Sequence, residues 1–62
     1  MGNESRLKYI SNEIQKLLDL RYKYHLQYDV SKDEGHKRYL LDKIKVCIER
    51  IDILQKEFDE LQ

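Results

Sequence analysis

The most unusual local composition in this chain is a basic, tyrosine-rich stretch near its middle. It runs from Arg21 to Tyr28 and resumes from His36 to Tyr39. Tyrosine rings stack on unpaired bases, and Lys and Arg side chains bind phosphates, so such a combination is typical of proteins that contact RNA loops. The residues that would make an RNA or partner contact here are Arg21, Lys23, His25, Lys37 and Arg38.

Residues that could support catalysis or hold a cofactor are sparse. There is no HExxH-type spacing and no glycine-rich loop to cradle a phosphate. His25 and His36 could approach each other with Asp29 nearby, but a metal site needs more converging ligands. Cys47 is the single cysteine, which excludes an internal disulfide framework. We therefore expect no enzymatic activity, no cofactor and no metal.

Length and charge narrow the class of protein further. With 62 residues the chain has room for one domain, expected over 1–62, whose stability is marginal without a partner chain. Twelve Lys and Arg residues balance 12 Asp and Glu residues, which argues against a generic nucleic-acid or membrane-surface binder. No apolar run approaches the length of a membrane span, and the first residues lack the apolar core of a secretion signal. A cytoplasmic location is the simplest expectation.

The spacing of apolar residues predicts two helices. Each has a row of positions three and four residues apart, here called the seam. The aperiodic segment between them, Asp29 to Gly35, has turn residues, and Ser31 to Glu34 matches a capping box. We expect helix one over about 4–28, a turn over about 29–32 and helix two over about 32–61. The seams contain Leu7, Ile10, Ile14, Leu17, Arg21, Tyr24 and Tyr28, then Leu40, Ile44, Cys47, Ile51, Leu54, Phe58 and Leu61, with Leu41 and Ile48 widening the second.

The two seams match when the chain is folded back on itself. Leu7 then meets Phe58 and Ile14 meets Ile51, in pairs whose residue numbers add to 65. The fold axis lies between Lys32 and Asp33, inside the aperiodic segment. The expected fold class is therefore all-α, an antiparallel two-helix hairpin.

Further apolar residues lie outside the seams and form a second stripe. An apolar stripe that one hairpin leaves uncovered usually marks an interface. A twofold homodimer, giving a four-helix bundle, is the first interpretation; docking onto a different protein and scattered surface residues are the alternatives. The predicted interface consists of Leu18, Tyr22, Leu26, Tyr39, Val46 and Ile53.

The distribution of charge along the chain favours a head-to-tail dimer. Residues 21–45 hold seven basic and four acidic side chains, whereas residues 46–62 hold two basic and five acidic ones. The turn end of the hairpin is thus positive and the open end leans negative. Two hairpins laid head to tail would place opposite charges side by side, which sets orientation more than it adds stability.

Two positions have competing interpretations. Arg21 stands where the seam requires an apolar residue; it either extends its charged head outward or pairs with an acidic residue across an interface. Tyr24 and Tyr28 lie on the seam and so belong to the core if the basic stretch is only a solvated face.

The overall plan resembles that of the plasmid RNA-modulator hairpins, which dimerise into four-helix bundles. The run LLDKIKVCIERIDIL (Leu40 to Leu54) is similar in apolar spacing to the second helix of the two-helix ribosomal protein near the exit tunnel. Both resemblances imply RNA contact. The closing LQKEFDEL resembles the SQELD motif of small two-helix sporulation phosphatases, with Gln55-Lys56 in place of Ser-Gln.

Taken together, the residues predict a non-enzymatic helical hairpin that dimerises and acts as a small regulator or adaptor through protein–protein interaction. An RNA-binding hairpin dimer that uses the turn end is one alternative. A structural subunit of a larger, phage-like helical assembly is another.

Overall fold

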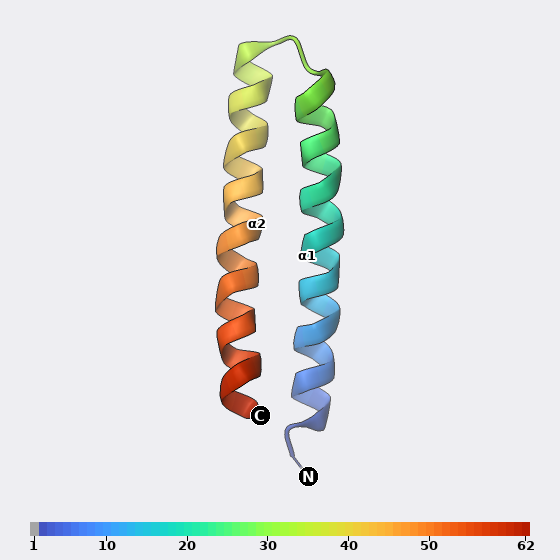
Figure 1. Ribbon diagram of the computed structural model, residues 1–62, viewed down its shortest axis with the longest axis vertical. Helices are drawn as coiled ribbons and strands as arrows, with labels where there is room; N and C mark the ends of the chain where they lie inside the picture. The colour runs from blue at the N-terminus through green and yellow to red at the C-terminus, as the bar shows by residue number, and fades with distance from the viewer. Residues whose placement is uncertain (1) are drawn as a thin grey trace.

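The computed structural model describes residues 2–62, which form two helices side by side in opposite directions (Figure 1). Helix α1 spans Glu4–Val30 and helix α2 spans Glu34–Leu61. The described residues contain no strand, and the only packing between elements is that of α1 against α2. The predicted all-α hairpin is confirmed. Met1, part of the domain expected over 1–62, lies outside the described residues.

The connection between the helices consists of Ser31, Lys32 and Asp33, and Asp33 is the N-cap of α2. Its carboxylate accepts a hydrogen bond from the Gly35 amide at 3.0 Å, as a helix N-cap does. The capping box expected from Ser31 is therefore not formed. Ser31 instead ends α1, where its amide donates to the Tyr28 carbonyl at 3.3 Å, and its hydroxyl oxygen accepts from the Asp33 amide at 3.3 Å and not from an amide inside α2. As a result α1 ends two residues later, and α2 begins two residues later, than expected.

The open end of the hairpin is tied by side chains from both helices. Asn3 precedes α1 and makes no capping hydrogen bond; its side-chain amide nitrogen donates to the Leu61 carbonyl of α2 at 3.2 Å. Beside it, Arg6 forms an ion pair with Glu57. The two chain ends lie together at this end, opposite the connection (Figure 1).

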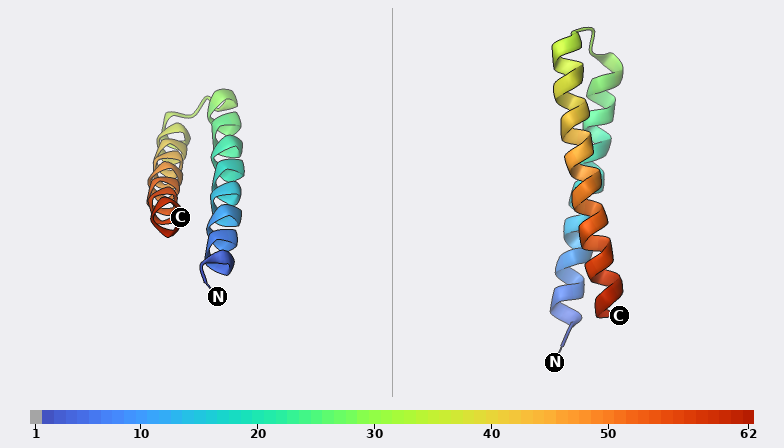
Figure 2. Two further views of the ribbon diagram at one scale, coloured as in Figure 1. Left: turned by 60° about the horizontal axis from the view of Figure 1, so that its bottom comes forward. Right: turned by 90° about the vertical axis from the view of Figure 1, so that its left-hand side faces the viewer.

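The observed register agrees with the predicted one to within two residues. The residue numbers of Arg6 and Glu57 add to 63. At the other end the amine of Lys37 lies 5.2 Å from the centre of the Tyr28 ring, and these numbers add to 65. In the side view of Figure 2, α2 crosses α1 at a shallow angle. All the predicted seam positions are buried or half-buried: Leu7, Ile10, Ile14, Leu17, Arg21, Tyr24 and Tyr28 on α1, and Leu40, Ile44, Cys47, Ile51, Leu54, Phe58 and Leu61 on α2.

The core is thin for a protein of this mass. Within residues 2–62 only Ile10, Leu40, Ile44 and Cys47 are buried. The Cα atoms extend over 50 × 14 × 10 Å. The accessible surface is 5115 Å², whereas a compact monomer of 7.6 kDa would expose about 4,300 Å². A hairpin alone therefore leaves surface exposed that a typical small domain would cover.

Candidate interaction site

The packed seam divides the exposed surface of the hairpin into two sides, each marked by a shallow groove between the helices. One groove, of about 220 Å³, is lined by Tyr9, Glu13, Leu17, Arg50, Ile53 and Leu54. The other, of about 180 Å³, is lined by Ser11, Ile14, Gln15, Gln55 and Phe58. Residues seven apart share one side of a helix. The residues that line each groove therefore show on which side of the hairpin the other positions beside the seam lie.

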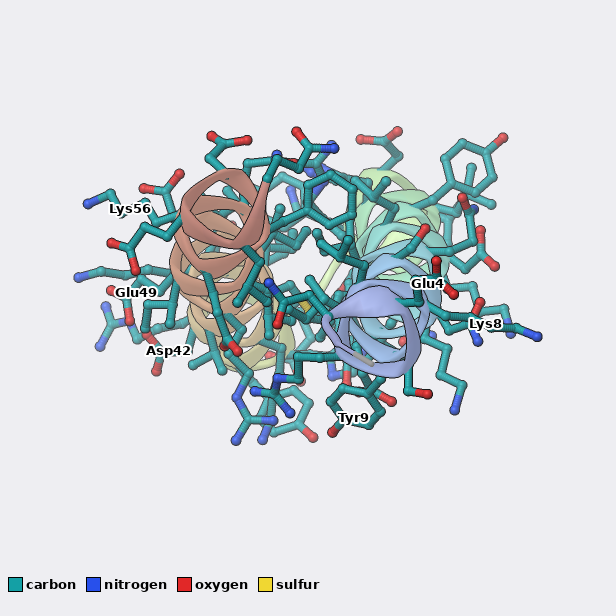
Figure 3. All side chains as sticks on the ribbon, turned by 90° about the horizontal axis from the view of Figure 1, so that it is seen from below. Glu4, Lys8, Tyr9, Asp42, Glu49 and Lys56 are labelled. Carbon is teal, nitrogen blue, oxygen red and sulfur yellow. The ribbon has the colours of Figure 1, made fainter. Side chains whose placement is uncertain are left out.

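The first side is here called the Val46 face. On α2 its apolar row is Tyr39, Val46 and Ile53, which are seven residues apart and all exposed. On α1 it includes Tyr9 and Leu20, also exposed. Tyr9 projects to one side of the helix pair when the molecule is seen along its length (Figure 3).

The ion pair at the open end belongs to the Val46 face. Arg6 donates two hydrogen bonds to the Glu57 carboxylate, at 2.6 and 2.9 Å, and its guanidinium lies 5.1 Å from the centre of the Tyr9 ring. The hydrogen bonds from Arg6 hold the pKa of Glu57 below its ordinary value, and the same bonds raise the pKa of Arg6. Both side chains are partly exposed, so water screens this interaction.

The opposite side is here called the Leu18 face. It is formed by Leu18 and Tyr22 from α1 and by Leu41 and Ile48 from α2. Leu18 is half-buried and the other three are exposed. In the observed register Tyr22 and Leu41 lie at similar heights along the rod, and so do Leu18 and Ile48. These four residues therefore form one apolar patch that crosses both helices.

The predicted interface is thus divided between surfaces. Tyr39, Val46 and Ile53 lie on the Val46 face, whereas Leu18 and Tyr22 lie on the Leu18 face. Leu26 lies on the outer side of α1, away from α2. Figure 3 shows the corresponding outer side of α2, where Asp42, Glu49 and Lys56 point away from α1. The structure does not bring the six residues together on one face.

Leu41 and Ile48 were expected to widen the seam, but both stay about half exposed. Sequence reasoning did not assign them to the interface. The signal that could have found them is their place directly after seam residues Leu40 and Cys47. In an antiparallel pair, the positions directly after these seam residues lie beside the equivalent positions of the other helix. On α1 one such position is Leu18, directly after seam residue Leu17.

The residues proposed to contact RNA are also spread over several surfaces. Arg21 and Lys37 occupy the seam side and are half-buried, while Lys23, His25 and Arg38 are exposed. Lys23 belongs to the Val46 side, and His25 and Arg38 belong to the Leu18 side. Near the turn, on the Val46 face, His36 stacks on Tyr39 with ring centres 6.1 Å apart, and the Lys43 amine lies 5.4 Å from the same tyrosine ring.

Arg21 has no ion-pair partner among residues 2–62. By the observed register it lies across the seam from Ile44, which is buried. A half-buried arginine without an acidic partner fits the interpretation that its aliphatic stem packs on the seam and its charged head stays in water.

Other kinds of site find no support among the described residues. Within residues 2–62 no three His, Cys, Asp or Glu side chains come together as metal ligands. Neither described helix is long and apolar enough to cross a membrane. Cys47 is buried on the seam as a free thiol.

Comparison with known proteins yields no match: no family model fits the sequence, and no curated protein or solved structure is significantly similar to it.

Proposed function

We propose that this protein is a non-enzymatic homodimer that forms a four-helix bundle and acts as a small regulator or adaptor by binding another protein. The observation that supports this most strongly is the imbalance between covered and uncovered apolar side chains. Four hydrophobic residues are buried, whereas ten large ones are exposed between residues 2 and 62. Burying a whole large apolar side chain contributes about 1.5–3 kcal/mol, and these side chains are roughly half exposed, so covering each of them contributes about 1 kcal/mol.

The arrangement of the exposed residues supports an interaction function more than chance scatter does. Single apolar residues on a surface need no explanation. Here, apart from Leu26 on the outer side of α1, they gather on two opposite faces of a rod, and those on α2 recur every seven residues. A second copy can cover one face, and the other then remains free on the outside of the bundle to bind a partner protein.

The charge of the Val46 face indicates the kind of partner that would fit it. The positions of both helices on this face hold five basic and three acidic side chains. The basic ones are Arg6, Lys16, Lys23, Lys43 and Arg50, and the acidic ones are Glu13, Glu57 and Glu60. An acidic amphipathic helix would match both this excess and the apolar row of Tyr39, Val46 and Ile53.

Sedimentation equilibrium over a wide range of concentrations, with helicity followed by circular dichroism, tests the proposal. A stable and highly helical species of twice the chain mass supports self-association. A helical monomer at all concentrations would contradict the homodimer, and a pull-down for a different partner would then be the next step. A chain that aggregates or stays partly unfolded would favour a structural subunit of a larger assembly.

RNA binding at the turn end is the second candidate function. The observation that favours it is the exposed Tyr39 ring, which lies against both His36 and Lys43. Titration with a single-stranded RNA loop at two salt concentrations separates the candidates. Phosphate contacts lose affinity steeply as salt rises, whereas apolar docking of a protein hardly responds.

A further inference from the structure

We infer that the second copy of this chain covers the Leu18 face, in a head-to-tail arrangement, and leaves the Val46 face outside. This inference rests on the proposed homodimer and names the surface through which it forms. It differs from the six-residue interface predicted from the sequence, whose members lie on the Val46 face, on the Leu18 face and on the outer side of α1.

The first argument is the charge of the rows that lie next to the seam, because a second hairpin covers these rows first. On the Leu18 side, the central positions of these rows hold no Asp, Glu, Lys or Arg. They are Ser11, Leu18 and His25 on α1, and Leu41, Ile48 and Gln55 on α2.

The matching central positions on the Val46 side are Glu13, Leu20 and Gln27 on α1 and Lys43, Arg50 and Glu57 on α2, and four of these six are charged. Burying such charges costs free energy unless each one is paired, and Glu57 already has its partner in Arg6 within the same chain. Packing against the Leu18 face avoids this cost at the central positions next to the seam.

The second argument is the shape and size of the surface. Leu18, Tyr22, Leu41 and Ile48 form one patch across both helices, midway along a rod whose Cα atoms extend over 50 Å. A face of that length and two helix diameters in width, about 20 Å, offers about 1,000 Å² to a partner. Stable complexes typically bury about 800 Å² per partner, so the available area is sufficient.

The third argument is complementarity under a twofold axis perpendicular to the helices. If this axis passes near Leu18, each copy of α1 runs antiparallel to the other. Ser11 of one copy then approaches His25 of the second, and Lys8 approaches Asp29, because the members of each pair lie at similar distances from residue 18.

The same axis passes between Leu41 and Ile48 on α2. It brings Leu41 near Ile48 of the second copy and Arg38 near Asp52. Among the charged residues of this face, only Lys45, at the rim beside the axis, meets its own copy, and it is exposed and can extend into solvent. Opposite net charges at the two ends of the hairpin favour the same head-to-tail orientation.

Single-cysteine cross-linking tests this arrangement in the full chain carrying Cys47→Ala. Leu18→Cys places a thiol at the proposed axis, and Val46→Cys places one at nearly the same height on the opposite face. Under mild oxidation we expect the Leu18→Cys chain to form a disulfide-linked dimer at least 10-fold faster than the Val46→Cys chain. A faster reaction at Val46→Cys would overturn the inference.

Charge substitution provides a second measurement that does not depend on cross-linking. Ile48→Lys on the Leu18 face should raise the dimer dissociation constant at least 100-fold, while Ile53→Lys on the Val46 face should change it less than threefold. Circular dichroism at high concentration establishes that both variants remain helical. If Ile53→Lys has the larger effect, the chosen face is wrong.

The two experiments distinguish the inference from the proposed function. An unsubstituted chain that sediments as a monomer overturns both. A dimer that Ile48→Lys dissociates, but in which Leu18→Cys fails to cross-link, overturns the head-to-tail orientation. A dimer that withstands Ile48→Lys overturns the Leu18 face and leaves the homodimer in place.

Discussion

Two leucines with the same exposure give a quantitative test of how the hairpin is covered. Leu26 and Leu41 are each 49% exposed. Leu26 lies on the outer side of α1, and Leu41 lies on the Leu18 face. Replacing either by alanine has the same effect on helix propensity and removes the same buried area from an isolated hairpin. A monomer would therefore respond almost equally to the two substitutions.

A dimer through the Leu18 face responds differently. Burying a whole leucine side chain contributes about 1.5–3 kcal/mol, so the half that the hairpin leaves exposed at Leu41 contributes about 1 kcal/mol when a second copy covers it. Two copies give about 2 kcal/mol per dimer, which corresponds to a dissociation constant about 30-fold higher for Leu41→Ala. Leu26→Ala should leave the dissociation constant nearly unchanged.

The assay is sedimentation equilibrium of the two variants and the unsubstituted chain at matched concentrations, with thermal melts at several concentrations as a second reading. In a dimer the melting temperature rises with concentration, and this dependence should shift for Leu41→Ala alone. Equal effects of Leu26→Ala and Leu41→Ala on the dissociation constant would refute the reasoning.

Three further predictions concern the hairpin itself. Leu40→Ala removes a fully buried side chain and should lower the free energy of unfolding by about 2–5 kcal/mol. This is a large part of the roughly 3–9 kcal/mol expected for a chain of this length. Urea denaturation measures the loss, and a loss well below 1 kcal/mol would contradict the assigned core. Asp33→Ala should cost about 1 kcal/mol of stability and Ser31→Ala less, since Asp33 caps α2; equal losses in thermal melts would argue against that cap. Because Arg6 lowers the folded-state pKa of Glu57, their pairing stabilises the fold above the ordinary carboxyl pKa, and this stability is lost as pH falls through the lowered value. Acid titration followed by circular dichroism should show a smaller acid-induced loss of stability in Glu57→Gln than in the unsubstituted chain. An unchanged titration would show that the ion pair does not contribute.

Periodicity was sufficient to predict the helices and their seams. A row of apolar residues three and four apart is a local property, and Leu40, Ile44 and Cys47 are buried as their spacing indicates. The hairpin followed because both rows end beside the same aperiodic segment. These features depend on the order of residues along each helix and require little knowledge of how the two helices meet.

The grouping of flank residues was harder to predict because it depends on packing. Tyr39 and Tyr22 both lie beside a seam, yet antiparallel packing places them on opposite faces. Leu41 and Ile48 looked like additional core, but two helices alone do not cover them. The start of α2 also differed, since Ser31 and Asp33 are both suitable caps and the choice between them depends on where α1 ends.

Small-angle X-ray scattering of the unsubstituted chain tests the central claim of a side-by-side dimer most directly, because it reports mass and shape together. The hairpin alone has a mass of 7.6 kDa and a Cα radius of gyration of 14.5 Å. A second hairpin packed alongside at the usual 8–10 Å between helix axes doubles the mass but raises the radius of gyration only to about 15–16 Å. We expect that result. The mass of a single chain at every concentration, or a doubled mass with a much larger radius from end-to-end association, would contradict the four-helix bundle.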